Sequence, residues 1–250
     1  MSAVNRVPWS LAGRLLARDW RSGEVLVLLA ALVIAVAAMS AVTFFTDRVR
    51  QAVAQSAGEA LAADLRVESI NPLPEDFRAI AFAHDLQVAD VVSFRSVVAA
   101  GAGTALADVR GVSGGYPLRG VVQVAERLSA VPRDASGIPP RGEVWAEPSL
   151  LARLGIDVGA EITVGNAALR VTRTLEFRPD EGWRFLEIAP TVLLNLEDLL
   201  SSGLLAPGSI AEYEQLYAGV DSDVAAFRRD LEPRLSPEHE LEDFRDGRPE

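Results

Sequence analysis

Residues Val25–Phe45 read VLVLLAALVIAVAAMSAVTFF and contain no charged residue, no proline and no glycine. As an α-helix this stretch would be about 31 Å long, which matches the roughly 30 Å hydrocarbon core of a bilayer. Twelve of its residues are Val, Leu, Ile or Phe, each of which favours insertion by about 0.3 to 0.6 kcal/mol. The pattern therefore predicts a transmembrane helix, whose apolar positions include Val25, Leu29, Val33, Val36, Phe44 and Phe45.

The alternative for this stretch is a cleavable signal peptide, but the apolar region of a signal peptide is only about 7 to 15 residues long. The flanking arginines predict the orientation of the helix, because cytoplasmic flanks carry an excess of Lys and Arg. Four arginines precede the stretch and only two follow it closely. We therefore expect a cytoplasmic N-terminal segment, residues 1–24, oriented by Arg14, Arg18 and Arg21, and an extracytoplasmic remainder.

Composition excludes several classes of function. The 250 residues carry a formal charge of −11; residues 1–45 contribute +2, so residues 46–250 carry −13. So acidic a region should repel nucleic acid. The chain contains no cysteine, which excludes disulfides and Cys-based zinc sites. It also contains no lysine, which a Walker A loop requires, so the chain is not itself a P-loop ATPase. We expect it to use no cofactor.

Beyond Phe45 the helical pattern continues outward. Apolar residues recur every four positions over residues 46–63, which predicts a helical stalk about 27 Å long, with Val49, Val53, Ala57 and Leu61 on one face. A continuous helix would transmit a movement from the membrane to the outer domain. The alternative is a break at Gly58, since a glycine inside a helix costs about 1 kcal/mol relative to alanine.

The region after the stalk predicts an α+β domain. In its first half we expect a strand from Asp64 and then a helix from Pro74 to about Asp85. Two strands, Val91–Ala99 and Thr104–Val109, should follow, joined by a hairpin turn. After them we expect a shaped loop at Gly111–Gly120 and a strand at Val121–Val124. A Pro- and Gly-rich crossing at Ala130–Gly142 leads to strands at Glu143–Ala146, Glu161–Val164, Ala168–Leu175 and Thr191–Leu194, and to helices at Pro148–Leu154 and after Asn195. The last part should hold an extended run, Ser209–Tyr217, a helix capped by Asp221, and a charged stretch without periodicity, Ser236–Glu250.

Several motifs in this order resemble the N-terminal part of a YbbP-type ABC transporter permease, a group within the MacB/FtsX/LolC-like permeases. The resemblance rests on RDWRSGEVLVLLAALVIAVAAMSAV, on FFTDRVRQAVAQSAGEALAADL, on the loop motif Gly115, Tyr116, Pro117, Leu118, Arg119 and Gly120, and on Ala189-Pro190 with Asn195-Leu196-Glu197-Asp198. It covers nearly the whole chain.

The resemblance implies a MacB-like periplasmic domain of two subdomains on one N-terminal transmembrane helix with its stalk. Residues 64–125 and 209–245 would form a split βα subdomain, residues 126–208 an inserted β-rich subdomain, and residues 246–250 a charged tail at a truncation point. The chain would lie in the bacterial inner membrane with its bulk in the periplasm. Its partners would be a cytoplasmic ABC ATPase subunit, the lipid bilayer and further membrane helices, because a single span cannot enclose a transport path.

The resemblance also implies a non-enzymatic permease subunit that acts on a lipid-like or hydrophobic cargo, with a periplasmic esterase or lysophospholipase as a companion. A single-span periplasmic binding or scaffold protein is the alternative from another class. A third interpretation, an anchored serine hydrolase, rests on Ser113 in a G-x-S-x-G match followed by Asp221 and His239. We do not favour it, because this motif needs a helix directly after the serine, whereas Tyr116 and Pro117 follow here.

Two further patterns have structural interpretations. His84 and His239 are the only histidines and neither has a suitably spaced partner, so we expect no metal site and a surface position for His84. The acidic runs Asp180-Glu181 and Glu238–Asp243 lack the spacing of a calcium loop, and we expect both to be solvated.

Overall fold

The computed structural model describes residues 27, 29–41, 44, 62–181, 189–205 and 210–243. The chain divides into two units, Met1–Val53 and Ala54–Glu250. In the first unit, residues 29–41 form a helix whose side chains are exposed. No helix within the described residues is both long enough and apolar enough to cross a membrane. Most of the flanking positions, among them Val25, Phe45 and the three orienting arginines, lie outside the described residues, so the membrane span stays a prediction.

The stalk positions Val49, Val53, Ala57 and Leu61 also lie outside the described residues. The predicted end of the stalk helix is wrong, however, because Ala62 and Ala63 form a turn and Ala62 has a positive φ of 57°. Both alanines are fully buried, so the chain turns here to place them in the core of the second unit.

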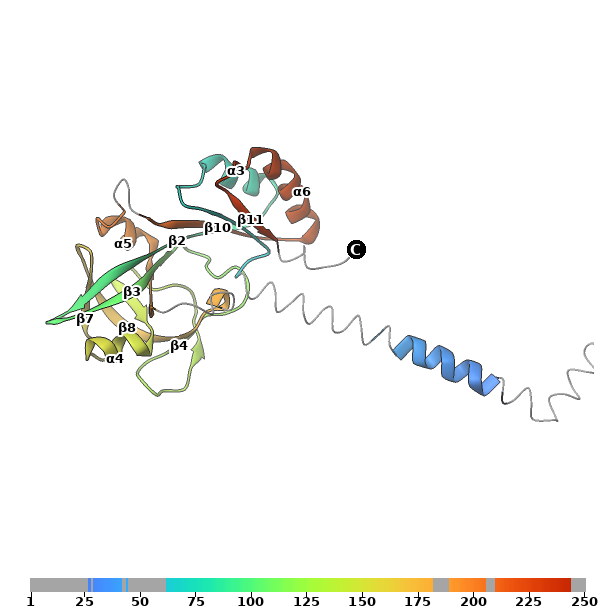
Figure 1. Cartoon of the computed structure of the whole chain (residues 1–250), viewed down its shortest axis with the longest axis horizontal. Coiled ribbons are helices and arrows are strands. Elements are labelled where there is room, and N and C mark those ends of the chain that lie inside the picture. The colour runs from blue at the N-terminus through green and yellow to red at the C-terminus, as the bar shows by residue number, and fades with distance from the viewer. Residues whose placement is uncertain are drawn as a thin grey trace, which may run out of the picture. The chain divides into compact units, whose positions relative to one another are not determined.

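The second unit is an α+β domain whose described strands all join one mixed sheet (Figure 1). The strands run β11-β1-β10-β2-β3-β9-β6-β8-β4-β5, and β7 pairs with β2 and β8. Their bounds are β1 Leu65–Ser69, β2 Gln87–Ala100, β3 Gly103–Val112, β4 Gln123–Ala125, β5 Arg133–Asp134, β6 Glu143–Ala146, β7 Glu161–Val164, β8 Ala167–Phe177, β9 Thr191–Asn195, β10 Glu212–Ala218 and β11 Glu240–Asp243. The helices are α3 Glu75–Ala83, α4 Pro148–Leu154, α5 Leu196–Ser201 and α6 Asp221–Leu231, with single turns η1 Pro179–Glu181 and η2 Glu232–Arg234.

One end of the sheet forms the first lobe, which we call the helix-covered lobe. It consists of β11, β1, β10 and the first half of β2, all antiparallel, with α3 and α6 packed on one face (Figure 1). Alternation along β1 turns Leu65 and Val67 toward the helices and leaves Arg66 on the other face. Phe77 from α3 and Phe227 from α6 complete this core.

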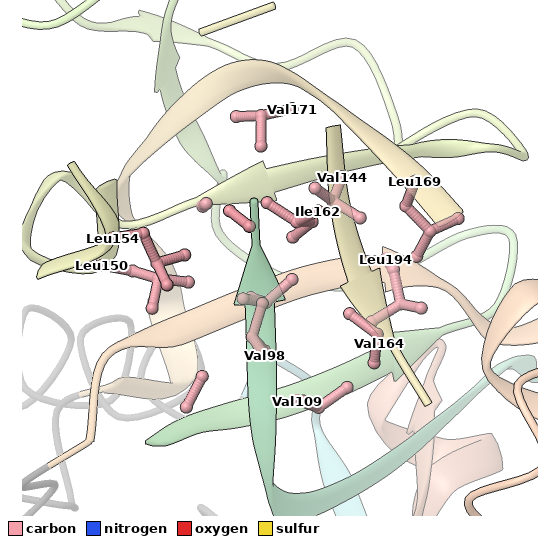
Figure 2. Close-up of a cluster of buried hydrophobic side chains, with 14 of the residues drawn as sticks. Val98, Val109, Val144, Leu150, Leu154, Ile162, Val164, Leu169, Val171 and Leu194 are labelled. Atoms are coloured by element: carbon pink, nitrogen blue, oxygen red, sulfur yellow. The ribbon is translucent and has the colours of Figure 1, made fainter. Parts of the chain in front are cut away.

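The second lobe is a closed ring of six strands. Pairing runs from β2 to β3, β9, β6, β8 and β7, and then back to β2, so every strand of the ring has two neighbours. Figure 2 shows the side chains that fill it, among them Val98, Val109, Val144, Ile162 and Leu194, converging on one another. The helix α4 adds Leu150 and Leu154 to the same core. Because β2 and β3 are long, they belong to the ring at one end and reach the helix-covered lobe at the other.

A third apolar cluster lies between the two lobes. The sheet of the first lobe contributes Ala89, Val91 and Leu216, and the outer faces of the ring strands contribute Trp145 and Leu193. The segment between β3 and β4 and the two buried alanines of the domain's first turn also pack into this cluster. The point where the chain enters the domain is therefore held between the lobes. The predicted division into two subdomains at residues 125/126 and 208/209 stays a prediction.

The structure confirms β6, α4 and β7 residue for residue, and α4 ends at Gly155 in the left-handed conformation. Asn195 accepts a hydrogen bond from the N–H of Glu197 at 3.0 Å, as a cap should. Two predictions are wrong. The residue at the N-cap of α6 is Val220 rather than Asp221, and the charged stretch after Ser236 contains the strand β11, which is stabilised by pairing with β1.

Candidate functional site

The chain enters the domain at the turn Ala62–Asp64, and this turn is fixed by three other segments. The N–H of Asp64 donates to the carbonyl of Tyr217 at 2.9 Å, and the N–H of Arg119 donates to the carbonyl of Ala62 at 2.9 Å. The first described residues after the predicted stalk thus bond to β10 and to the loop between β3 and β4.

Side chains strengthen this attachment. The guanidinium of Arg119 holds the Asp64 carboxylate with two parallel hydrogen bonds, Nε to Oδ1 at 2.9 Å and Nη2 to Oδ2 at 2.6 Å. The N–H of Gly219 donates to Asp64 Oδ2 at 3.0 Å, and Arg119 Nη2 donates to the Gly219 carbonyl at 3.2 Å. A bidentate arginine–carboxylate pair fixes both position and direction. We call Ala62, Asp64, Arg119 and Gly219 the junction clamp.

Gly219 packs closely against Leu86. A Cβ atom there would lie 2.4 Å from Cδ2 of Leu86, which is buried in the core of the helix-covered lobe. A larger residue at position 219 would therefore require the Leu86 side chain to shift.

The predicted loop motif, Gly115–Gly120, is the segment that carries Arg119. Tyr116 is buried between the lobes, and its hydroxyl donates to Asp180 Oδ1 at 2.8 Å. Leu118 packs on the same inter-lobe cluster. Gly115 and Gly120 have φ values of 94° and 72°, which favour glycine, so both ends of the motif need this residue type. The motif is thus a shaped loop, as predicted, although Gly111 and Val112 before it belong to β3.

Asp180 connects this loop to a buried ion network between the lobes. Arg110 on β3 contacts Asp180 Oδ2 at 2.5 Å and donates to both carboxylate oxygens of Glu214 on β10 at 2.9 and 3.0 Å. Arg178 lies 3.5 Å from Asp180 Oδ1. Arg66 on β1 reaches the other side of Glu214 at 3.3 Å. We call Arg66, Arg110, Arg178, Asp180 and Glu214 the inter-lobe ion network.

The charges of this network set one another's pKa values. Burial raises the pKa of Asp180, but Arg110 and Arg178 lower it by more, so the carboxylate stays ionised. Burial lowers the pKa of Arg110, whereas Asp180 and Glu214 raise it well above its ordinary value. Burial and the charge of Asp180 both raise the pKa of Tyr116, which therefore remains a neutral donor.

The last described residues of the domain lie beside the place where the chain enters it. Strand β11 is antiparallel to β1 and pairs Asp243 with Leu65 and Glu242 with Arg66. Arg66 also forms an ion pair with the Glu242 side chain, and Arg228 on α6 holds Asp243 at 3.0 Å. The first residue of β1 and the last residue of β11 thus lie at the same end of this strand pair.

The residues of the hydrolase interpretation are not assembled as a triad. The hydroxyl of Ser113 accepts a hydrogen bond from the N–H of Asp90 at 2.7 Å. Nδ1 of His239 accepts a hydrogen bond from the N–H of Ser236 at 3.1 Å, and the imidazole ring makes a T-shaped contact with the ring of Phe77. Asp221 lies in the first turn of α6.

His84 follows α3, where its Nε2 lies 2.9 Å from Asp230, and its side chain is half-buried against Phe227. Among the described residues, no group of three or more His, Cys, Asp or Glu is placed to hold a metal ion.

The sequence alone did not identify the charged residues that form the junction clamp and the inter-lobe ion network. Asp180 was expected to be solvated, but it is only 6% exposed because Arg110 and Tyr116 enclose it. Asp64 was predicted only as the start of a strand, and Arg110, just beyond the predicted strand Thr104–Val109, was given no role. A charged residue among apolar strand positions is a signal for a buried ion pair, and Arg110, between Val109 and Gly111-Val112, shows that signal.

Comparison with known proteins relates the chain to a class, the ABC transporter permeases. Over 222 residues it is 30% identical to the uncharacterized ABC transporter permease YbbP of Escherichia coli (strain K12). The similarity covers 88% of this chain and 26% of that protein, so the chain spans about a quarter of the length of this relative. The resemblance predicted from the sequence motifs is thereby confirmed.

Two solved structures are similar to the domain. The periplasmic region of MacB from Actinobacillus actinomycetemcomitans gives a TM-score of 0.48 at 11% identity, covering 76% of this chain and 92% of that one. The extracellular domain of the noncanonic ABC-type transporter YknZ from Gram-positive bacteria gives a TM-score of 0.48 at 10% identity, covering 72% and 100%. No protein-family model matches the chain.

Proposed function

We propose that this chain is the N-terminal part of an ABC transporter permease, with residues 25–45 as its first membrane helix and the domain from Ala62 onward outside the cytoplasm. The observation that carries the proposal is the similarity to YbbP along 88% of the chain. An alignment of 222 of the 250 residues is longer than the domain from Ala62 onward, so it extends into the sequence that precedes the domain and holds the uncharged stretch.

The geometry of the domain supports insertion between membrane segments. A domain whose first and last strands pair with each other can be inserted into another chain without disturbing its core. Strands β1 and β11 pair in this way, so two membrane segments could lead into and out of the domain side by side.

In the proposed mechanism, a cytoplasmic ATPase subunit supplies the energy and the permease converts it into a movement of the outer domain. The chain has no lysine for a Walker A loop, so these 250 residues would not bind ATP in that way, and a separate cytoplasmic subunit would do so. A helical stalk over residues 46–61 would pass the movement to the domain. The cargo would be a lipid-like or hydrophobic molecule, and a secreted esterase would be a companion.

Co-purification and a break in the stalk test this proposal. The full-length permease that carries this segment should co-purify with an ATPase, whereas the 250-residue chain alone should not hydrolyse ATP. Replacing Ala52 and Val53 with Pro-Gly should abolish transport while ATP hydrolysis persists, since proline costs about 3 kcal/mol or more inside a helix. The domain should still fold, because its core begins at Ala62. A full-length protein that binds no ATPase would support the scaffold alternative.

A further inference from the structure

We infer that the junction clamp is the point at which movement of the stalk enters the outer domain, and that Asp64 and Arg119 are the positioning residues for this coupling. The inference rests on the proposed function and adds the residues that carry it. It starts from the fact that the turn Ala62–Asp64 is the first described part of the domain.

A turn can transmit a movement only if it is tied to the rest of the domain. Backbone pairing of β1 begins at Leu65, one residue beyond the clamp. The turn itself is held by the N–H of Arg119 on the carbonyl of Ala62 and by the N–H of Asp64 on the carbonyl of Tyr217. The Asp64 carboxylate then adds three charge-assisted hydrogen bonds, two from Arg119 and one from Gly219. Such bonds are roughly twice as strong as neutral ones.

The clamp joins three segments that are far apart in the sequence. It connects the incoming chain to the loop between β3 and β4 and to the end of β10. In this loop, Tyr116 donates a hydrogen bond to Asp180 of the inter-lobe ion network. Asp180 contacts Arg110, and Arg110 donates to Glu214. A displacement of the incoming turn is therefore passed to both lobes through side-chain bonds, in addition to strand β1.

Because the junction clamp is partly exposed to solvent, its loss should affect coupling more than folding. Arg119 is 39% exposed and Asp64 11% exposed at the side chain, so water can replace part of their interaction. A matched pair exists elsewhere in the domain, since Arg78 on α3, also 39% exposed, pairs with Asp90 at 22%. Loss of Arg78 should perturb the fold to a similar extent without touching the incoming turn. This makes Arg78→Ala the control for Arg119→Ala.

The first measurement uses the 250-residue chain and needs no transport. Amide hydrogen exchange should be at least about tenfold faster at Gly219 in Asp64→Ala than in the wild type, because its N–H loses a charged acceptor. Arg119→Ala should have a smaller effect at the same amide, and Arg78→Ala should have none. Unchanged protection of Gly219 in Asp64→Ala would overturn the clamp itself, whatever the function of the protein.

The second measurement uses the full-length permease with its ATPase and compares cargo moved per ATP hydrolysed. Arg119→Ala and Asp64→Ala should lower this ratio at least about tenfold, with a shift of the unfolding midpoint of about 4 °C or less. Arg119→Lys should retain part of the coupling, since it keeps the charge but not the two parallel bonds. A wild-type ratio in Arg119→Ala, or an equal loss in Arg78→Ala, would overturn the inference. Absence of any transport by the wild-type complex would instead refute the proposed function.

Discussion

The inter-lobe ion network and the junction clamp use the same chemistry in different surroundings. In the network, the side chains of Arg110 and Glu214 are each only 2% exposed, and Nη2 of Arg110 lies 2.9 Å from Oε1 of Glu214. In the clamp, the side chains of Arg119 and Asp64 are 39% and 11% exposed, and Nη2 of Arg119 lies 2.6 Å from Oδ2 of Asp64. Similar distances therefore do not imply similar contributions. Breaking a buried pair leaves a charge without a partner in a medium that cannot solvate it, whereas water can partly replace a pair in which one partner, here Arg119, is partly exposed. The network should hold the lobes together, and the clamp should direct movement.

Arg110→Ala should give the largest effect. It removes the cation shared by Asp180 and Glu214 and leaves two buried carboxylates with less compensation. We expect the free energy of unfolding to fall by about 3 to 5 kcal/mol. Urea denaturation of the 250-residue chain measures this change. A loss below about 1 kcal/mol would show that water reaches these groups and that the network is not a buried one.

Tyr116→Phe tests the link between the loop and the network. The substitution keeps the ring between the lobes but removes the hydroxyl that donates to Asp180 at 2.8 Å. A hydrogen bond to a charged group contributes about 1.5 to 3 kcal/mol, and the free energy of unfolding should fall by that amount. A matched control is Tyr213→Phe, because Tyr213 on β10 is a partly buried tyrosine that packs against the core of the ring and is not a member of the network. Equal stability of the Tyr116→Phe variant and the wild type would contradict the link.

Acid should weaken the network gradually. The pKa of Asp180 is lowered in the folded state, so its contribution to stability is present above the unfolded pKa of about 3.9 and is lost as the pH falls through the folded pKa. Stability should therefore decline below about pH 4, with a smaller slope in Asp180→Asn. Unfolding midpoints measured from pH 7 to pH 3 test this. The same slope in both proteins would assign the acid sensitivity to other carboxylates.

Arg119→Ala should give the smallest effect on stability. Because the guanidinium is 39% exposed, we expect the free energy of unfolding to fall by about 1 kcal/mol or less. Urea denaturation of the Arg119→Ala and Arg110→Ala variants under the same conditions measures the difference between their losses of stability. A loss as large as that of Arg110→Ala would mean that the clamp is a structural element of the core, and the distinction between the two sites would fail.

Local patterns predicted the elements of this domain well, because alternation and turn residues lie within a few positions of each other. The strand β7 and the helix α4 with its closing glycine were found in this way. Strand β11 could not be found, since the sequence ELED has no apolar alternation and becomes a strand only by pairing with β1. The site was harder still. Arg119 could be singled out within its motif, but its partner Asp64 lies 55 positions earlier and nothing local connects them.

Amide hydrogen exchange in the full-length permease, bound to its ATPase with and without trapped nucleotide, tests the central claim most directly. If ATP hydrolysis moves the domain through the junction clamp, nucleotide should change the exchange rates at Asp64, Arg119 and Gly219, whose N–H groups bond across the clamp. The amide of Asp108, which donates to the carbonyl of Pro190 at 2.9 Å beside the inter-lobe ion network, should keep its protection. Unchanged exchange at all three clamp amides, in a complex that hydrolyses ATP and transports its cargo, would contradict the account.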